Sequence, residues 1–177
     1  MALDLPEDER GRLADWRDAA VAGRSDLRPV APASLHLTLV FLGYRPEKEV
    51  PAIGEAVTGA ATGLEPALLR PVEVVGVPPR RPRLFALDLE DDGGRASAVQ
   101  AAVSDALEAA RFYRPEKRPF WPHLTLARVK RDARAAPLEV EPPAGAFEAR
   151  EVTLYQSLLS PRGARYEPLI KVRLGAR

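Results

Sequence analysis

The chain has 177 residues, of which 46 % are hydrophobic and 29 % charged, and its formal net charge is +1. This balance is typical of a globular protein and excludes a mainly disordered chain. The chain has no cysteine, which excludes disulfide frameworks and zinc–thiolate sites. No apolar run approaches the roughly 20 residues needed to span a bilayer, and the acidic start "MALDLPEDER" lacks the charge pattern of a signal peptide. We therefore expect one domain, residues 1–177, in the cytoplasm and not in a membrane.

Hydrophobic periodicity and turn signals predict a mixture of helices and strands. The predicted helices cover residues 6–22, 46–61 and 94–112, and the last of these has the clearest apolar stripe. The predicted strands cover residues 35–42, 68–77, 83–90, 123–129, 150–159 and 166–174. A turn, "VPPRRP", separates the second and third strands, and a proline-rich loop through Pro143 follows the fourth. The predicted fold class is α+β.

The order of these elements repeats along the chain. The tetrapeptide "ALDL" occurs at residues 2–5 and at 86–89, and each copy precedes a helix and then a strand that carries a histidine. Asp4 lies 32 positions before His36 (36 − 4), and Asp88 lies 35 positions before His123 (123 − 88). A unit that occurs twice implies two lobes related by a pseudo-twofold axis. The two histidine strands could then face each other.

The chain has two histidines, and each begins a tetrad "HLTL". Because side chains alternate along a strand, His36 and Thr38 share one face, as do His123 and Thr125, while the leucines point to the opposite side. For one tetrad, ordinary core packing is a sufficient explanation. With five threonines in 177 residues, however, a threonine two positions after both histidines is expected by chance about 0.1 % of the time. The duplication therefore favours a catalytic pair.

These residue types fit acid–base chemistry on a phosphate. Imidazole has a pKa near 6.5, so one ring can take a proton while the other gives one. A threonine hydroxyl can donate a hydrogen bond to a phosphoryl oxygen. Between Arg111 and Arg134, eight basic and two acidic side chains leave a charge of +6 (8 − 2), which favours an anionic ligand. The charge run alone does not distinguish this from arginines that only solubilise the surface.

The paired tetrads resemble the His-x-Thr-x motifs of the 2H phosphoesterase superfamily. The stretches "DLPED", "LHLTLVFLG", "RPFWPHLTLAR" and "TLYQSLLSPRGARYEPL" are similar to the bacterial and archaeal RNA 2′,3′-cyclic phosphodiesterases, also called 2′-5′ RNA ligases. The resemblance covers nearly the whole chain. It implies a bilobal fold in which antiparallel sheets line a central cleft with helices outside, and it implies no metal or other cofactor.

The resemblance also implies roles for particular residues. His36 corresponds to the proton donor and His123 to the proton acceptor. Thr38 and Thr125 would hold the phosphate, and Arg128 matches an arginine just after the second motif. The implied substrate is an RNA or nucleotide with a 2′,3′-cyclic phosphate end, which is opened to a 2′-phosphate. We expect the protein to act as a monomer.

Aromatic side chains near the tetrads are candidates for stacking on a base. Trp121 is preferred because it lies beside the second motif among arginines, and Phe41 follows the first motif. For the other aromatic rings, core packing is the simpler explanation. Those rings are Tyr44, Phe120, Tyr155 and Tyr166.

Two alternatives stay open at this point. The same site could carry out reversible, ATP-independent 2′-5′ ligation if a ribose hydroxyl replaced water, and a non-catalytic RNA- or nucleotide-binding module could keep the motifs for recognition alone. A metal site is disfavoured because neither histidine has a carboxylate within four positions.

Relatives usually begin with several more apolar residues before "DLP". We therefore expect a short first strand, or a true start upstream of Met1.

Overall fold

The structure, a computed structural model, describes residues 1–160 and 163–175. The helices are α1 (Glu7–Ala20), α2 (Val50–Ala61) and α3 (Arg95–Ala109), with short 3-10 turns η1 (Pro32–Ser34) and η2 (Glu47–Glu49). The strands are β1 (Ala2–Asp4), β2 (Leu27–Pro29), β3 (His36–Thr38), β4 (Ala67–Val77), β5 (Leu84–Asp92), β6 (His123–Val129), β7 (Phe147–Ala149), β8 (Glu151–Ser160) and β9 (Gly163–Arg173).

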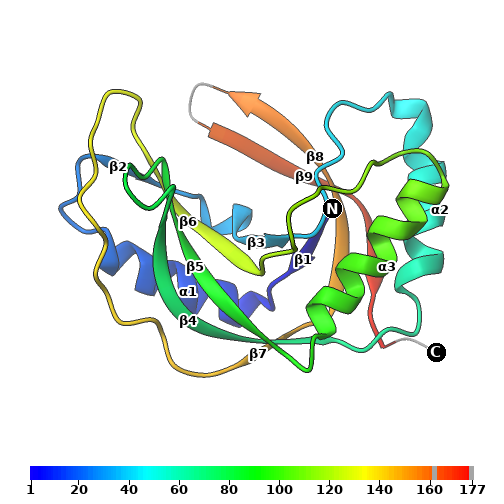
Figure 1. Ribbon diagram of the computed structural model, residues 1–177, viewed down its shortest axis with the longest axis horizontal. Helices are drawn as coiled ribbons and strands as arrows, with labels where there is room; N and C mark the ends of the chain where they lie inside the picture. The colour runs from blue at the N-terminus through cyan, green and yellow to red at the C-terminus, as the bar shows by residue number, and fades with distance from the viewer. Residues whose placement is uncertain (161–162, 176–177) are drawn as a thin grey trace.

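The described strands form one curled antiparallel sheet. Its order is β7-β4-β5-β6-β3-β1-β8-β9, and β2 pairs with β6 outside this path. Helices α2 and α3 lie side by side at one end of the molecule, and α1 lies at the other (Figure 1). The predicted α+β class with antiparallel sheets is confirmed. No helix in the described part of the chain is long and apolar enough to cross a membrane.

The predicted repeat is present as two strand–helix–strand units. The first is β1, α1 and β3, and the second is β5, α3 and β6. The last strands of the two units, β3 and β6, are neighbours at the centre of the sheet, and each pairs on its other side with the first strand of its own unit. The two "HLTL" tetrads are thereby brought into direct contact.

The leucines of the tetrads build the core beneath this centre. Leu37 and Leu124 have no exposed surface, and Leu126 is equally buried. Helix α3 packs its predicted stripe of Val99, Val103 and Leu107 into the same cluster. Burying such side chains stabilises the fold by about 1.5–3 kcal/mol each, so the core fixes which face of β3 and β6 turns outward.

Three local features differ from the sequence prediction. The strand predicted over residues 35–42 is too long, because the N–H groups of Leu39 and Val40 both donate to the carbonyl of Met1 instead of continuing the ladder. Strand β4 accommodates Pro71 through a register shift next to it. Strands β2 and β7 were not predicted, since three residues are too few to show a period of two.

Candidate active site

The register of β3 and β6 places the two tetrads face to face. Leu37 lies opposite Leu124, so antiparallel pairing places His36 opposite Thr125 and Thr38 opposite His123. All four side chains point away from the buried leucines. The two imidazoles therefore occupy one diagonal and the two hydroxyls the other. Diagonal neighbours have Cα atoms roughly 7–8 Å apart, which leaves room for a phosphate between them.

The flanking strands extend this square into two symmetric rows. Asp4 on β1 is the cross-strand partner of His36, and Asp88 on β5 is the partner of His123. Small alanines lie beside the two threonines. Each row crosses the strands in the order β5, β6, β3, β1. The first row is Asp88, His123, Thr38 and Ala2. The second row is Ala86, Thr125, His36 and Asp4. Sequence reasoning missed the two aspartates as neighbours of the histidines, although the "ALDL" repeat was the signal that could have found them.

His36 lies in an enclosed environment. The ring of Tyr155 is stacked on it at a centroid distance of 5.6 Å, and Tyr166 meets it edge-on at 4.8 Å. Its Nδ1 atom is buried and has no hydrogen-bond partner among the described residues. Burial lowers the pKa of His36 from 6.5 to about 4, although the nearby Asp4 carboxylate acts in the opposite direction. The free imidazole is therefore uncharged at neutral pH.

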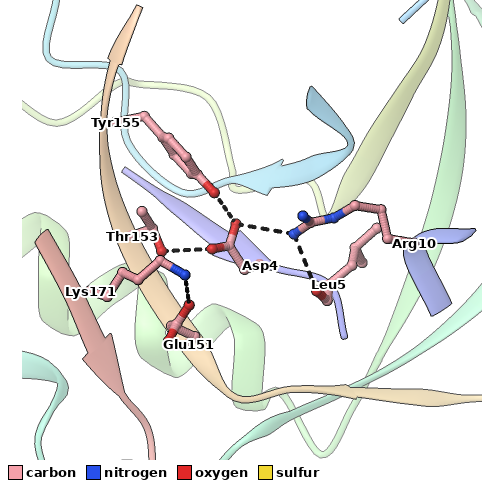
Figure 2. Close-up of polar contacts among 7 residues, drawn as sticks. All are labelled: Asp4, Leu5, Arg10, Glu151, Thr153, Tyr155 and Lys171. Carbon is pink, nitrogen blue, oxygen red and sulfur yellow. Dashed lines mark hydrogen bonds and ion pairs between the residues drawn. The ribbon is translucent and has the colours of Figure 1, made fainter. Parts of the chain in front are cut away.

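The carboxylate of Asp4 is the centre of a buried polar network (Figure 2). It accepts a hydrogen bond of 2.7 Å from the Thr153 hydroxyl and one of 2.6 Å from the Tyr155 phenol, and Arg10 lies 3.8 Å away. Burial, and then the hydrogen bond to Asp4, raise the pKa of Tyr155 above its usual range, so the phenol stays a donor. A buried charge that is paired and hydrogen-bonded in this way holds its neighbours in place.

His123 lies in a more open environment. The Trp121 ring is stacked on it at 4.0 Å with an interplanar angle of 16°. The Nδ1 atom of His123 is 2.8 Å from the carbonyl oxygen of Trp121, which can only accept, so Nδ1 carries a hydrogen and donates it to that carbonyl. The indole N–H of Trp121 donates a hydrogen bond of 2.6 Å to Asp88. In this half of the site the Trp121 carbonyl thus fixes Nδ1 as a donor and leaves Nε2 as the ring nitrogen that can exchange a proton with a ligand.

A β-bulge determines where Arg128 points. Ala86 pairs with Thr125 but Leu84 pairs with Arg128, so β6 has one extra residue between these pairs. Strict alternation along β6 would have turned Arg128 to the leucine side. The bulge instead brings it to the same face as Thr125, opposite Arg28 of β2. Arg128 is exposed there, about 10 Å along the strand from Thr125.

The remaining predicted residues lie at the edges of this face. Trp121 is 36 % exposed, and one side of its ring is occupied by His123. Phe41 lies beyond the end of β3 and is 75 % exposed, so little of the protein packs around its ring. The structure thus brings the two histidines, the two threonines and Trp121 together and leaves Phe41 outside that group.

Two hollows lie away from the histidines. One of about 330 Å³ adjoins the Arg128 end of β6, and the described residues that line it include no carboxylate. Its charged lining residues are Arg80, Arg81, Arg83 and Arg134. A larger hollow of about 580 Å³ lies between β4 and residues 137–142 and contains none of the tetrad side chains. Among the described residues, no three His, Cys, Asp or Glu side chains are grouped as metal ligands.

The chain belongs to the 2′-5′ RNA ligase superfamily, whose family model matches residues 5–160, as the resemblance to 2H phosphoesterases predicted. It is 35 % identical to the RNA 2′,3′-cyclic phosphodiesterase of Thermus thermophilus, over 98 % of this chain and 88 % of the relative. It is 31 % identical to the enzyme of the same name from Aeropyrum pernix, over 92 % and 95 %.

Solved structures of related proteins have the same fold. A crystal structure of a Thermus thermophilus protein superposes with a TM-score of 0.82 at 32 % identity, covering 99 % of this chain and 96 % of that one. Escherichia coli LigT in complex with 3′-AMP superposes with a TM-score of 0.77 at 26 % identity, covering 98 % and 95 %. The predicted 2H phosphoesterase fold is therefore confirmed, and the division of the chain into two lobes stays a prediction.

Proposed function

We propose that the protein hydrolyses RNA or nucleotide 2′,3′-cyclic phosphodiesters to 2′-phosphomonoesters, with His36 and His123 as acid and base and without a metal ion. The observation that carries this proposal is the register of Leu37 with Leu124, which makes a square of two imidazoles and two hydroxyls on one face. The names of the curated relatives from several species support the same enzyme class. Residues 1–177 would act as one unit, because each half contributes one histidine.

The proposed reaction is an in-line displacement at phosphorus. His123 takes a proton through Nε2 from a water molecule as the water oxygen attacks phosphorus. The bond from phosphorus to the ribose 3′ oxygen breaks, and His36 donates a proton to that oxygen. The products are a 2′-phosphomonoester and a free 3′ hydroxyl. The identity of the leaving oxygen rests on the family resemblance, since either ribose oxygen could face His36.

The neutral state of free His36 has a consequence for this mechanism. An acid must carry its proton before the leaving group departs, yet burial holds the pKa of His36 at about 4. A phosphate anion bound beside the ring favours the charged imidazolium and raises that pKa. We infer that His36 gains its proton as substrate binds. Donation is then coupled to occupation of the site.

The threonines and arginines would bind the charged part of the substrate. Thr38 and Thr125 lie on the other diagonal of the square, which crosses the line between the histidines, and can donate hydrogen bonds to the non-bridging phosphoryl oxygens. Arg128, turned to this face by the bulge, supplies a positive charge next to them. Escherichia coli LigT has been crystallised with 3′-AMP, which is consistent with a nucleotide as the ligand. Trp121 or Phe41 would contact the base.

Incubation with a nucleoside 2′,3′-cyclic phosphate, with and without EDTA, tests this proposal. Turnover that EDTA leaves intact and that His36→Ala or His123→Ala abolishes supports it. Turnover restored only by added zinc or manganese contradicts the metal-free mechanism. Joining to an added 5′-hydroxyl RNA would indicate ligation instead, and binding without turnover would indicate a recognition module. That the protein is a monomer in the cytoplasm stays a prediction from the sequence.

A further inference from the structure

Each histidine has the same two companions in the structure. One is an aspartate directly opposite it on the neighbouring strand, and the other is an aromatic ring stacked on the imidazole. In each half the polar hydrogen of the aromatic ring is donated to the aspartate. The two sets are Asp4, Tyr155 and His36 in the first half and Asp88, Trp121 and His123 in the second.

We propose that Asp4 with Tyr155, and Asp88 with Trp121, are positioning pairs that fix the ring planes of the two catalytic histidines. This inference rests on the proposed function, because it assigns the pairs to the acid and the base of that reaction. In each pair the carboxylate holds the aromatic ring, and the aromatic ring holds the imidazole. The carboxylates thus act through an aromatic neighbour.

The hydrogen bonds of the histidines support this indirect arrangement. An aspartate that acted on a histidine directly would accept a hydrogen bond from its ring nitrogen, as in a catalytic triad. Among the described residues, neither aspartate does so: Nδ1 of His36 has no partner, and Nδ1 of His123 faces the carbonyl of Trp121. The oxygens of Asp4 and Asp88 accept from the phenol and the indole instead.

The second pair is the more informative, because Trp121 is not part of the buried core. Trp121 is 36 % exposed and lies in the segment before β6, outside regular structure. Even so, its ring is nearly parallel to that of His123 at 4.0 Å, and its N–H is 2.6 Å from the Asp88 carboxylate. A hydrogen bond to a charged acceptor is among the stronger kinds. An exposed tryptophan held this firmly against an imidazole has a positional role.

The two pairs arose on different elements, which strengthens the inference. Tyr155 comes from β8, a strand outside both repeated units, whereas Trp121 precedes the second tetrad itself. The aspartates occupy equivalent positions of the "ALDL" repeat, but their aromatic partners do not occupy equivalent positions. In both halves an aromatic ring that donates to the aspartate is stacked on the imidazole, although the two rings come from different parts of the sequence, as expected if ring position matters at both histidines.

The test compares variants of the second pair in the full-length protein. Trp121→Phe keeps an aromatic ring but removes the N–H, Asp88→Ala removes the acceptor, and Asp88→Asn keeps an acceptor oxygen. Trp16→Phe is the matched control, because the Trp16 indole donates to the Glu141 carbonyl on another part of the molecule. The substrate is a nucleoside 2′,3′-cyclic phosphate. Steady-state kcat and KM are measured for each variant.

A loosened imidazole should slow the chemical step more than it weakens binding. Misplacing a reacting group by about 1 Å can cost on the order of 10²-fold in rate. We expect Trp121→Phe and Asp88→Ala each to lower kcat about ten- to hundredfold with little change in KM. The double variant should be no worse than the poorer single variant, and Asp88→Asn should recover most of the loss. Trp16→Phe should keep wild-type kcat.

Nuclear magnetic resonance gives a readout that does not depend on turnover. The chain has two histidines, so two sets of imidazole signals are expected, and His36→Ala assigns them. Trp121→Phe and Asp88→Ala should weaken the contacts between ring 121 and the His123 ring and reduce the preference for the Nδ1–H form. Trp16→Phe should leave both sets unchanged.

The outcomes separate this inference from the proposed function. If wild type turns over the substrate and His123→Ala does not, the proposed function stands. Unchanged kcat in Trp121→Phe and Asp88→Ala would then overturn the positioning pairs alone. A raised KM at normal kcat would also overturn them, because it would make Trp121 a base-stacking residue. If the wild-type protein does not hydrolyse the substrate at all, the proposed function fails. The positioning pairs can still be tested by NMR in that case, because unchanged His123 signals in Trp121→Phe and Asp88→Ala would contradict them.

Discussion

The two halves of the site contain the same residues in different surroundings. In each half an aspartate, a histidine and a threonine lie on one face of adjacent strands, related by the pseudo-twofold repeat. His36 is enclosed by two tyrosines beside a buried carboxylate network, whereas His123 lies in a more open environment under a partly exposed tryptophan. Burial lowers the pKa of His36 to about 4. The duplicated motif thus places two histidines in unlike environments, and under the proposed function environment, not residue type, sets which one is the acid and which the base.

Removing either histidine should have the largest effect on activity in either half of the site. We expect His36→Ala and His123→Ala each to lower kcat/KM by about two to four orders of magnitude, as for a lost acid or base. The double variant should be little worse than the poorer single variant, because the two groups act in one step. Steady-state kinetics on a cyclic nucleotide measure this. Near-normal turnover of either single variant would remove that histidine from the mechanism.

The burial of His36 should appear in the stability of the protein as well as in its activity. Its folded pKa of about 4 lies below the unfolded value of 6.5, so between these values the unfolded chain binds the extra proton. Stability is therefore present above pH 6.5 and is lost as the pH falls toward 4. The shift corresponds to about 3 kcal/mol.

Urea denaturation at several pH values checks this expectation. His36→Gln removes the titrating group, so the stability difference between wild type and this variant should change by about 3 kcal/mol between pH 7.5 and pH 4. His123→Gln removes the other imidazole and serves as the matched control. A pH-independent difference between wild type and His36→Gln would show that His36 is not held neutral by burial.

Much of the arrangement of the two halves could be predicted from the sequence, and particular residues show which features could not. The alternation of side chains in the tetrads correctly predicted that each histidine shares one face of its strand with its threonine. This prediction needs only neighbouring residues, because side chains alternate every two positions and the leucines are buried on the opposite face. Arg128 would have been turned to the wrong face by the same rule, since a bulge depends on pairing with β5. The predicted strand past Thr38 was too long because its hydrogen bonds go to Met1. Contacts between distant segments, such as Tyr155 on His36, leave no local pattern to detect.

Replacing the threonines tests whether the second diagonal of the square holds the phosphate. Thr38→Val and Thr125→Val keep the shape but remove one neutral donor each, so we expect a loss of about 1–3 kcal/mol in transition-state binding. That loss is read from kcat/KM with the cyclic nucleotide. Thr58→Val, in helix α2, is the matched control away from the site. If neither site variant differs from Thr58→Val, the hydroxyls do not contact the phosphate.

We expect the arginine-lined hollow to contact phosphates of an RNA chain beyond its cyclic end, because the charged residues that line it are all arginines. Changes there should have the smallest effect, and only on longer substrates. Arg80→Ala and Arg81→Ala should each weaken binding of an oligoribonucleotide about two- to fivefold and leave a mononucleotide unaffected. Each lost phosphate contact should also reduce the slope of log K against log salt by about 0.7. Arg70→Ala, whose side chain pairs with Glu90 outside the hollow, is the control. Equal effects on mononucleotide and oligonucleotide would contradict an RNA-binding role for this hollow.

Phosphorus NMR of the products formed from a nucleoside 2′,3′-cyclic phosphate tests the central claim most directly. The claim is that His123 activates water while His36, on the enclosed side, protonates the departing 3′ oxygen. We expect a single 2′-phosphate signal, formed equally with and without EDTA and absent with His36→Ala. A dominant 3′-phosphate, or a product that forms at the same rate without His36, would contradict it.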